Sequence, residues 1–238
     1  MMNDNNDNID IDLYIKNINK ELKNISLDSC FEFESMKNDF LTFYIKNIDF
    51  KLANNLRRIM FKDIDTMAIE HIFIQKNTSV MSDEILSQRL SLIPILADPD
   101  DFSEEDTINF KLEVKNISKE NDENYKNYEN NKINLNVHSN QLIYNGNPIK
   151  SKIQLNEEYY PKSKYEDILI LKLKSNQEIK VDMYCIKGNG RKHSKFCPVS
   201  IVQLQKVNTS DAKFVIETIG VLHPLNIILK ALQILKNY

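Results

Sequence analysis

Two segments decide the fold of this chain: LANNLRRIM (residues 52–60) and MAIEHIFIQKNTSVMSDEILSQRLSLIPILADP (residues 67–99). In the first, the apolar residues recur at i, i+4, i+7 and i+8, which is the spacing of one helix face. These residues are Leu52, Leu56, Ile59 and Met60. Asp49 stands where an N-cap is expected, while Arg57 and Arg58 point away from the apolar face. The pattern predicts a helix with one dry face and one basic face.

The second segment predicts a strand, a turn and another helix. Residues 67–74 are rich in β-branched and apolar residues and predict the strand, and residues 77–79 predict the turn. Ser82 is a plausible N-cap for a helix that runs to about residue 92, because carboxylates follow it in the first turn. Pro94 ends that helix.

Strand patterns surround this centre on both sides. Residues 40–48 are aromatic and β-branched, and residues 107–115 alternate apolar and polar residues with period two. Three further strand-like runs lie at 133–138, 168–173 and 179–186. Because these strands follow the helices and do not alternate with them, we predict an α+β fold. Residues 116–132 lack aliphatic side chains almost completely and predict a solvated excursion.

The end of the sequence, FVIETIGVLHPLNIILKALQIL (residues 214–235), contains a very apolar helix. Pro224 suits its first turn. The apolar residues cover nearly the whole circumference: Leu225, Ile227, Ile228, Leu229, Ala231, Leu232, Ile234 and Leu235. Such a helix must be buried against something.

The segment KGNGRKHSKFCPVS (residues 187–200) is the one dense basic stretch of the sequence. It lacks the GxxxxGK[ST] spacing of a phosphate-binding loop and is followed by a strand pattern. Its charges do not alternate with the aromatic residues that stacking on nucleic-acid bases requires. Contact with a protein and contact with nucleic acid both stay open from these residues alone.

Composition excludes several other classes. A formal charge of -3 in 238 residues argues against extended wrapping of nucleic acid. The three cysteines form no CxxC pair, so we expect neither a disulfide framework nor a zinc site, even with His193 and Cys197 four residues apart. His71 and His138 have no nucleophile at triad spacing, and the acidic run at residues 98–106 lacks the EF-hand pattern. No run reaches the about 18 apolar residues of a membrane span, and we expect no cofactor.

Three blocks, at residues 52–99, 187–200 and 214–235, resemble the α-like subunits of multisubunit RNA polymerases in the same order. This family also includes the archaeal α-like subunits and the bacterial α N-terminal domain. The resemblance implies a discontinuous dimerisation domain, a sheet with two helices, formed by residues 30–74 and 199–238. It implies an inserted, mostly β domain at 75–198, and we expect a mobile arm at 1–29, with a short helix around 13–22.

The resemblance implies a non-catalytic assembly subunit in the nucleus, in nucleolus and nucleoplasm. It would pair with a small α-like subunit and nucleate the second-largest and largest subunits, with DNA and RNA contacted only through the complex and no membrane involved. The implied dimer interface is Leu52, Leu56, Ile59, Met60, Ile227, Ile228, Ala231, Leu232 and Leu235. The implied interface with the second-largest subunit is Arg57, Arg58, Lys187, Arg191, Lys192, His193, Lys195 and Phe196.

Features of the sequence resemble the type shared by eukaryotic polymerases I and III. Residues 75–184 hold no cysteine cluster, Phe196 stands where the polymerase II type tends to have Trp, and NTSV occupies residues 77–80. The connection at residues 201–213 is much shorter than is usual in that type, which suggests a reduced assembly. With its last helix exposed, the isolated chain would self-associate. The alternative is a free-standing nucleic-acid-binding module that uses residues 187–195.

Overall fold

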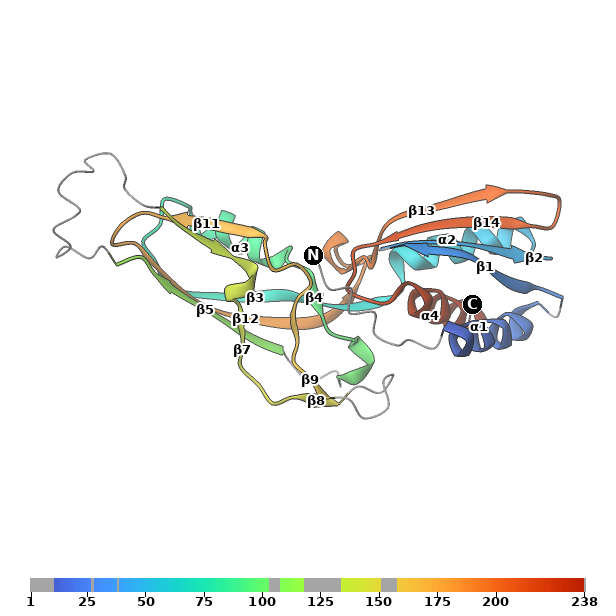
Figure 1. Cartoon of the computed structure of the whole chain (residues 1–238), viewed down its shortest axis with the longest axis horizontal. Coiled ribbons are helices and arrows are strands. Elements are labelled where there is room, and N and C mark those ends of the chain that lie inside the picture. The colour runs from blue at the N-terminus through green and yellow to red at the C-terminus, as the bar shows by residue number, and fades with distance from the viewer. Residues whose placement is uncertain are drawn as a thin grey trace. The chain divides into compact units, whose positions relative to one another are not determined.

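The computed structural model describes residues 11–26, 28–37, 39–102, 108–117, 134–150 and 158–237. The chain forms two compact units, Met1–Asp65 with Asn189–Tyr238, and Thr66–Gly188. Both combine antiparallel sheets with α-helical structure (Figure 1), so the predicted α+β class is confirmed.

The first unit is built on a four-stranded antiparallel sheet with the order β1-β2-β14-β13. Its strands are β1 (Cys30–Lys37), β2 (Phe40–Lys46), β13 (Val199–Lys206) and β14 (Ala212–Thr218). Along β2, Leu41, Phe43 and Ile45 are buried and their neighbours are more exposed, so one face of the sheet carries the core. At its centre the ring of Phe43 stacks on that of Phe214 with centroids 4.9 Å apart.

Three helices share that core: α1 (Ile11–Ile25), α2 (Phe50–Lys62) and α4 (Pro224–Lys236). α4 packs against α1 and α2, while α1 also contacts β1 and α2 also contacts β13 (Figure 1). The predicted helix over residues 52–60 is confirmed, and Asp49 caps it by accepting a hydrogen bond from the Lys51 amide at 3.2 Å. Pro224 is in the first turn of α4, as expected.

The prediction of a mobile arm over residues 1–29 is wrong for residues 11–25, which form α1. Ile18 and Leu22 have no exposed surface and belong to the core of the first unit. Ile18 and Leu22 are separated by polar residues in the sequence, but in a helix they lie on the same face. The helix around residues 13–22 that the sequence suggested is therefore a packed element.

The short connection at residues 201–213 is a β-hairpin. It pairs Leu204 with Phe214 and Lys206 with Ala212, and Val207 donates a backbone hydrogen bond to Asp211 at 3.0 Å to close the turn. The connection thus contains most of β13, the turn at residues 207–211 and the start of β14.

In the part of the chain that the structure describes, the second unit contains a four-stranded sheet with the order β3-β12-β5-β7 and the α-helix α3 (Asp83–Ser91). The bounds of the four strands are β3 (Asp65–Asn77), β5 (Ile108–Lys115), β7 (Ile143–Tyr144) and β12 (Glu178–Asn189). Shorter antiparallel pairs are β6 (Leu135–His138) with β11 (Leu169–Leu173), β4 (Ile95–Leu96) with β10 (Lys162–Ser163), and β8 (Ile149–Lys150) with β9 (Glu158–Tyr159). A second core of its own includes Ile69, Leu86, Phe110 and Met183.

Most sequence predictions for this unit match an element. The strand expected at 67–74 is longer at both ends, and the helix expected after Ser82 is α3, although the Ser82 side chain makes no capping hydrogen bond. Of the solvated excursion predicted at 116–132, all but the first two residues lie outside the described part of the chain.

Candidate interaction surfaces

The apolar face of α2 lies inside the first unit. Leu56 and Met60 have no exposed surface and Ile59 is 4% exposed, whereas Leu52 is partly exposed. The α2 face therefore packs on its own sheet and on α4, and Leu52 is at its edge.

The predicted interface residues of α4 are equally enclosed. Ile227, Ile228, Ala231 and Leu232 have no exposed surface, and Leu235 is 8% exposed. Of the nine residues predicted for the dimer interface, eight are thus core residues in this structure. The reason is that α1, α2 and the sheet together surround α4.

On α2 and α4, four partly exposed apolar side chains lie beside this core, and three of these four are not among the residues predicted for the dimer interface. Phe61 on α2 and Leu229 and Ile234 on α4 pack against the core yet retain exposed surface, as Leu52 does. Their periodicity places them on the flanks of each helix, which is the signal that could have separated them from the core positions.

Residues 189–200 of the dense basic stretch, which we call the basic loop, are held at the C-terminal end of α2. A Cβ atom on Gly190 would lie 2.1 Å from the carbonyl oxygen of Phe61, so this close approach requires glycine. The Arg191 amide donates to the Lys62 carbonyl at 3.2 Å, and its Nε forms an ion pair with Asp63. The loop therefore belongs to the first unit, and the units divide about nine to ten residues before the predicted boundaries at 74/75 and 198/199.

Phe196 anchors the other end of the loop. Phe196 was expected to contact a partner, but its ring has no exposed surface in this structure. The Nζ atoms of Lys192 and Lys195 lie 5.6 Å and 5.3 Å from its centroid, and His193 Nδ1 accepts from the Lys195 amide at 3.1 Å. The buried ring thereby positions the two charges above it.

The loop thus brings its basic residues to the end of α2, which carries basic residues of its own. Arg58 is exposed and lies one turn before the exposed Lys62, so both occupy the same face of the helix. We name as the basic corner Arg58, Lys62, Arg191, Lys192 and Lys195. Arg57 is half-buried and its Nε donates to Asn54 Oδ1 at 3.1 Å, while Lys187 belongs to the second unit.

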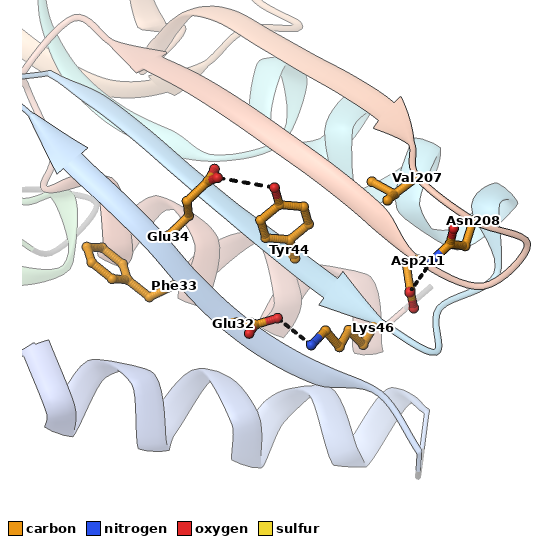
Figure 2. A pocket seen from close by; sticks show the side chains of 8 residues that line it. All are labelled: Glu32, Phe33, Glu34, Tyr44, Lys46, Val207, Asn208 and Asp211. Atoms are coloured by element: carbon orange, nitrogen blue, oxygen red, sulfur yellow. Dashed lines mark hydrogen bonds and ion pairs between the residues drawn. The ribbon is translucent and has the colours of Figure 1, made fainter.

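A shallow pocket lies on the outer face of the sheet in the first unit (Figure 2). Within the lining, Lys46 pairs with Glu32 at 2.6 Å, and Glu34 pairs with Lys213, which lies outside the lining, at 2.8 Å. The hydrogen bond from Lys213 lowers the pKa of Glu34. The remaining lining residues are Phe33, Tyr44, Val207, Asn208 and Asp211. The first pair joins the neighbouring strands β2 and β1, and the second joins β14 to β1 across β2, so both indicate a structural role for this face.

The residues considered for metal binding or catalysis are dispersed. Cys185 is buried in the core of the second unit, and Cys197 lies in the first, where burial raises the pKa of its thiol. Asp98 accepts from the Asp100 amide at 3.0 Å, and Asp101 accepts from the Tyr159 hydroxyl at 3.0 Å, so these carboxylates brace their own loop. Within the described ranges, no three His, Cys, Asp or Glu side chains gather as a metal site requires. No helix in the same ranges is both long and apolar enough to cross a membrane.

Known proteins are similar to this chain over about two thirds or more of its length. The profile of the RNA polymerase Rpb3/Rpb11 dimerisation domain matches residues 42–238. DNA-directed RNA polymerases I and III subunit RPAC1 of Mus musculus is 36% identical over 180 residues, which are 69% of this chain and 50% of the relative. The Dictyostelium discoideum subunit rpac1 is 38% identical over 168 residues, 67% of this chain and 47% of the relative.

An archaeal relative is covered more completely. DNA-directed RNA polymerase subunit Rpo3 of Methanocaldococcus jannaschii is 30% identical over 185 residues, 78% of this chain and 79% of the relative. By contrast, the chain spans about half the length of the eukaryotic relatives above.

Proposed function

The chain belongs to the RNA polymerase Rpb3/Rpb11 dimerisation-domain family, and from this membership we propose that it is a non-catalytic assembly subunit of RNA polymerases I and III. In this proposal it pairs with a small α-like subunit. The heterodimer then recruits the second-largest and the largest subunit, within the nucleus and its nucleolus, and DNA and RNA are contacted only through the assembled enzyme.

One observation carries the proposal. The match to the dimerisation profile begins within β2 and includes both α2 and α4, which lie against each other on one face of the same sheet. A dimerisation domain needs such a shared apolar layer, with partly exposed side chains at its border. Leu52, Phe61, Leu229 and Ile234 meet that description.

The basic corner is proposed as the docking site for the second-largest subunit. Its arginine and lysine side chains stand on a rigid base, because Gly190 and Arg191 tie the loop to α2 and the Phe196 ring is buried. Guanidinium groups match carboxylates and backbone carbonyls of a protein partner.

A free-standing nucleic-acid-binding module is the less favoured alternative. The aromatic ring nearest to the lysines, Phe196, is buried and cannot stack on a base, and the guanidinium of Arg191 is already paired with Asp63. Base stacking on an aromatic ring and attraction of phosphates by a free guanidinium group are the two interactions by which such a loop binds single strands. Burial of Phe196 removes the first, and the ion pair of Arg191 weakens the second.

Co-expression tests the pairing. A tagged full-length chain and the small α-like subunit are expected to elute together as a 1:1 complex in size-exclusion chromatography with light scattering. Leu52→Asp with Leu229→Asp is expected to abolish the complex, whereas Ile201→Asp, at a side chain 51% exposed on β13, serves as the matched control. Separate elution of the two wild-type chains would overturn the proposal.

A further inference from the structure

α1 covers the helix on which dimerisation is proposed to depend. Its apolar residues form one continuous stripe: Ile11, Ile15, Ile18, Leu22 and Ile25. Ile18 and Leu22 are completely buried in the same core as Ile228 and Leu232 of α4. In this structure α1 of the same chain thus buries part of the apolar surface of α4.

Specific contacts hold α1 in place. The ring of Tyr14 lies against that of His223 at the start of α4, with centroids 5.6 Å apart, and Glu21 is 3.9 Å from Lys236 at the end of α4. The two helices therefore run in the same direction, as Figure 1 also shows them side by side. On its other flank, the Asn19 side chain accepts a hydrogen bond from the Phe31 amide of β1 at 2.8 Å.

Apart from Leu13, the outer face of α1 is polar. Asp12, Lys16, Lys20 and Lys23 are exposed on it. By packing on α4, the helix replaces an apolar surface with a charged one, which is what a subunit without its partner needs to stay dispersed.

α1 is also not part of the shared dimerisation element. The family profile matches residues 42–238, so it includes α4 and leaves out α1. The attachment is modest as well, because α1 contributes two fully buried side chains whereas α4 contributes five apolar ones with no exposed surface. Elements with little buried apolar area open at lower free-energy cost than the core they cover.

We propose that α1 is an intramolecular cap, which occupies part of the α4 surface in the free chain and is displaced when a helix of the small α-like subunit packs there. The inference rests on the proposed function. It reverses one expectation from the sequence: with α4 capped, the isolated chain is a dispersed monomer and does not self-associate.

Hydrogen exchange on the wild-type chain tests displacement directly. The amides of α1 are expected to be protected in the free chain and to lose that protection in the heterodimer, while the amides of α4 keep theirs. Unchanged or increased protection of α1 in a heterodimer that has formed would overturn the cap. A wild-type chain that forms no heterodimer would overturn the proposed function instead, so the two failures are distinguishable.

Loosening the cap tests the competition. Ile18→Ala with Leu22→Ala weakens the seat of α1, and Leu13→Ala, at a side chain 53% exposed on the same helix, is the control. The apparent affinity for the small α-like subunit is proportional to the fraction of the free chain in which α1 has left α4. If this fraction is about a tenth in the wild type, the double variant is expected to bind about tenfold more tightly. The control is expected to bind like the wild type. Equal or weaker binding by a double variant whose circular dichroism matches the wild type would contradict the proposal.

Discussion

At the scale of single residues, Gly190 decides whether the basic loop can reach α2. A Cβ atom there would lie 2.1 Å from the Phe61 carbonyl oxygen and 3.3 Å from Lys62 Cα, both backbone atoms that cannot rotate away. Gly190→Ala is therefore expected to lower the free energy of unfolding by about 1–3 kcal/mol, as overpacking does. Urea denaturation measures it, with Ser194→Ala at an exposed position of the same loop as the control. An unchanged midpoint would mean that the loop does not need this contact.

Glu34 offers a second test at this scale. The hydrogen bond from Lys213 lowers the pKa of the Glu34 carboxyl, so the interaction contributes to stability at neutral pH and is lost as the pH falls through that lowered value. Lys213→Met should raise the pKa of Glu34 towards its ordinary range. A carboxyl-detected NMR titration measures the shift. If the titration of Glu34 is the same in both proteins, the ion pair does not persist in solution.

At the scale of elements, the start of α2 depends on a single cap. Asp49 accepts from the Lys51 amide, whereas Ser82, at the corresponding position of α3, makes no such bond. Asp49→Ala is expected to cost about 1 kcal/mol of unfolding free energy, and Ser82→Ala clearly less, because only the first removes a capping hydrogen bond. Equal losses in urea denaturation would refute the assignment.

Periodicity predicted α2 and α4 well and α1 only in part, for a physical reason. α2 and α4 carry enough adjacent apolar residues to mark a face, whereas in α1 Ile18 and Leu22 stand among Asn, Lys and Glu. Its burial depends on α4, which lies some two hundred residues later in the sequence. For the same reason, the sequence alone could not predict that Ile228 and Leu232 are buried within their own chain. Placing Asp at both positions would unfold the first unit, so partly exposed residues such as Leu229 are the proper probes of an interface.

At the scale of the whole molecule, the resemblance to the α-like subunits predicted a discontinuous organisation, while the contacts of the loop could not be predicted from the sequence. Residues 187–198 were expected within the inserted domain, but Arg191 contacts Lys62 and Asp63 across a sequence separation that no local pattern reports. The role of Phe196 changed for the same reason, because burial of its ring is a tertiary property.

Assembly of the complete polymerase gives the last prediction. Lys192→Glu with Lys195→Glu reverses charges of the basic corner without breaking the Arg191–Asp63 pair that holds the loop. The heterodimer is expected to form normally, whereas capture of the second-largest subunit should weaken by roughly 10–100-fold, since like charges then face each other at a close interface. Lys37→Glu with Lys51→Glu changes the net charge equally at exposed sites of the same unit and should bind like the wild type. A pull-down of the second-largest subunit by the preformed heterodimer measures both. If the Lys192 and Lys195 variant instead assembles fully and loses affinity for template with a steep dependence on salt, the basic corner binds nucleic acid and the docking assignment is wrong.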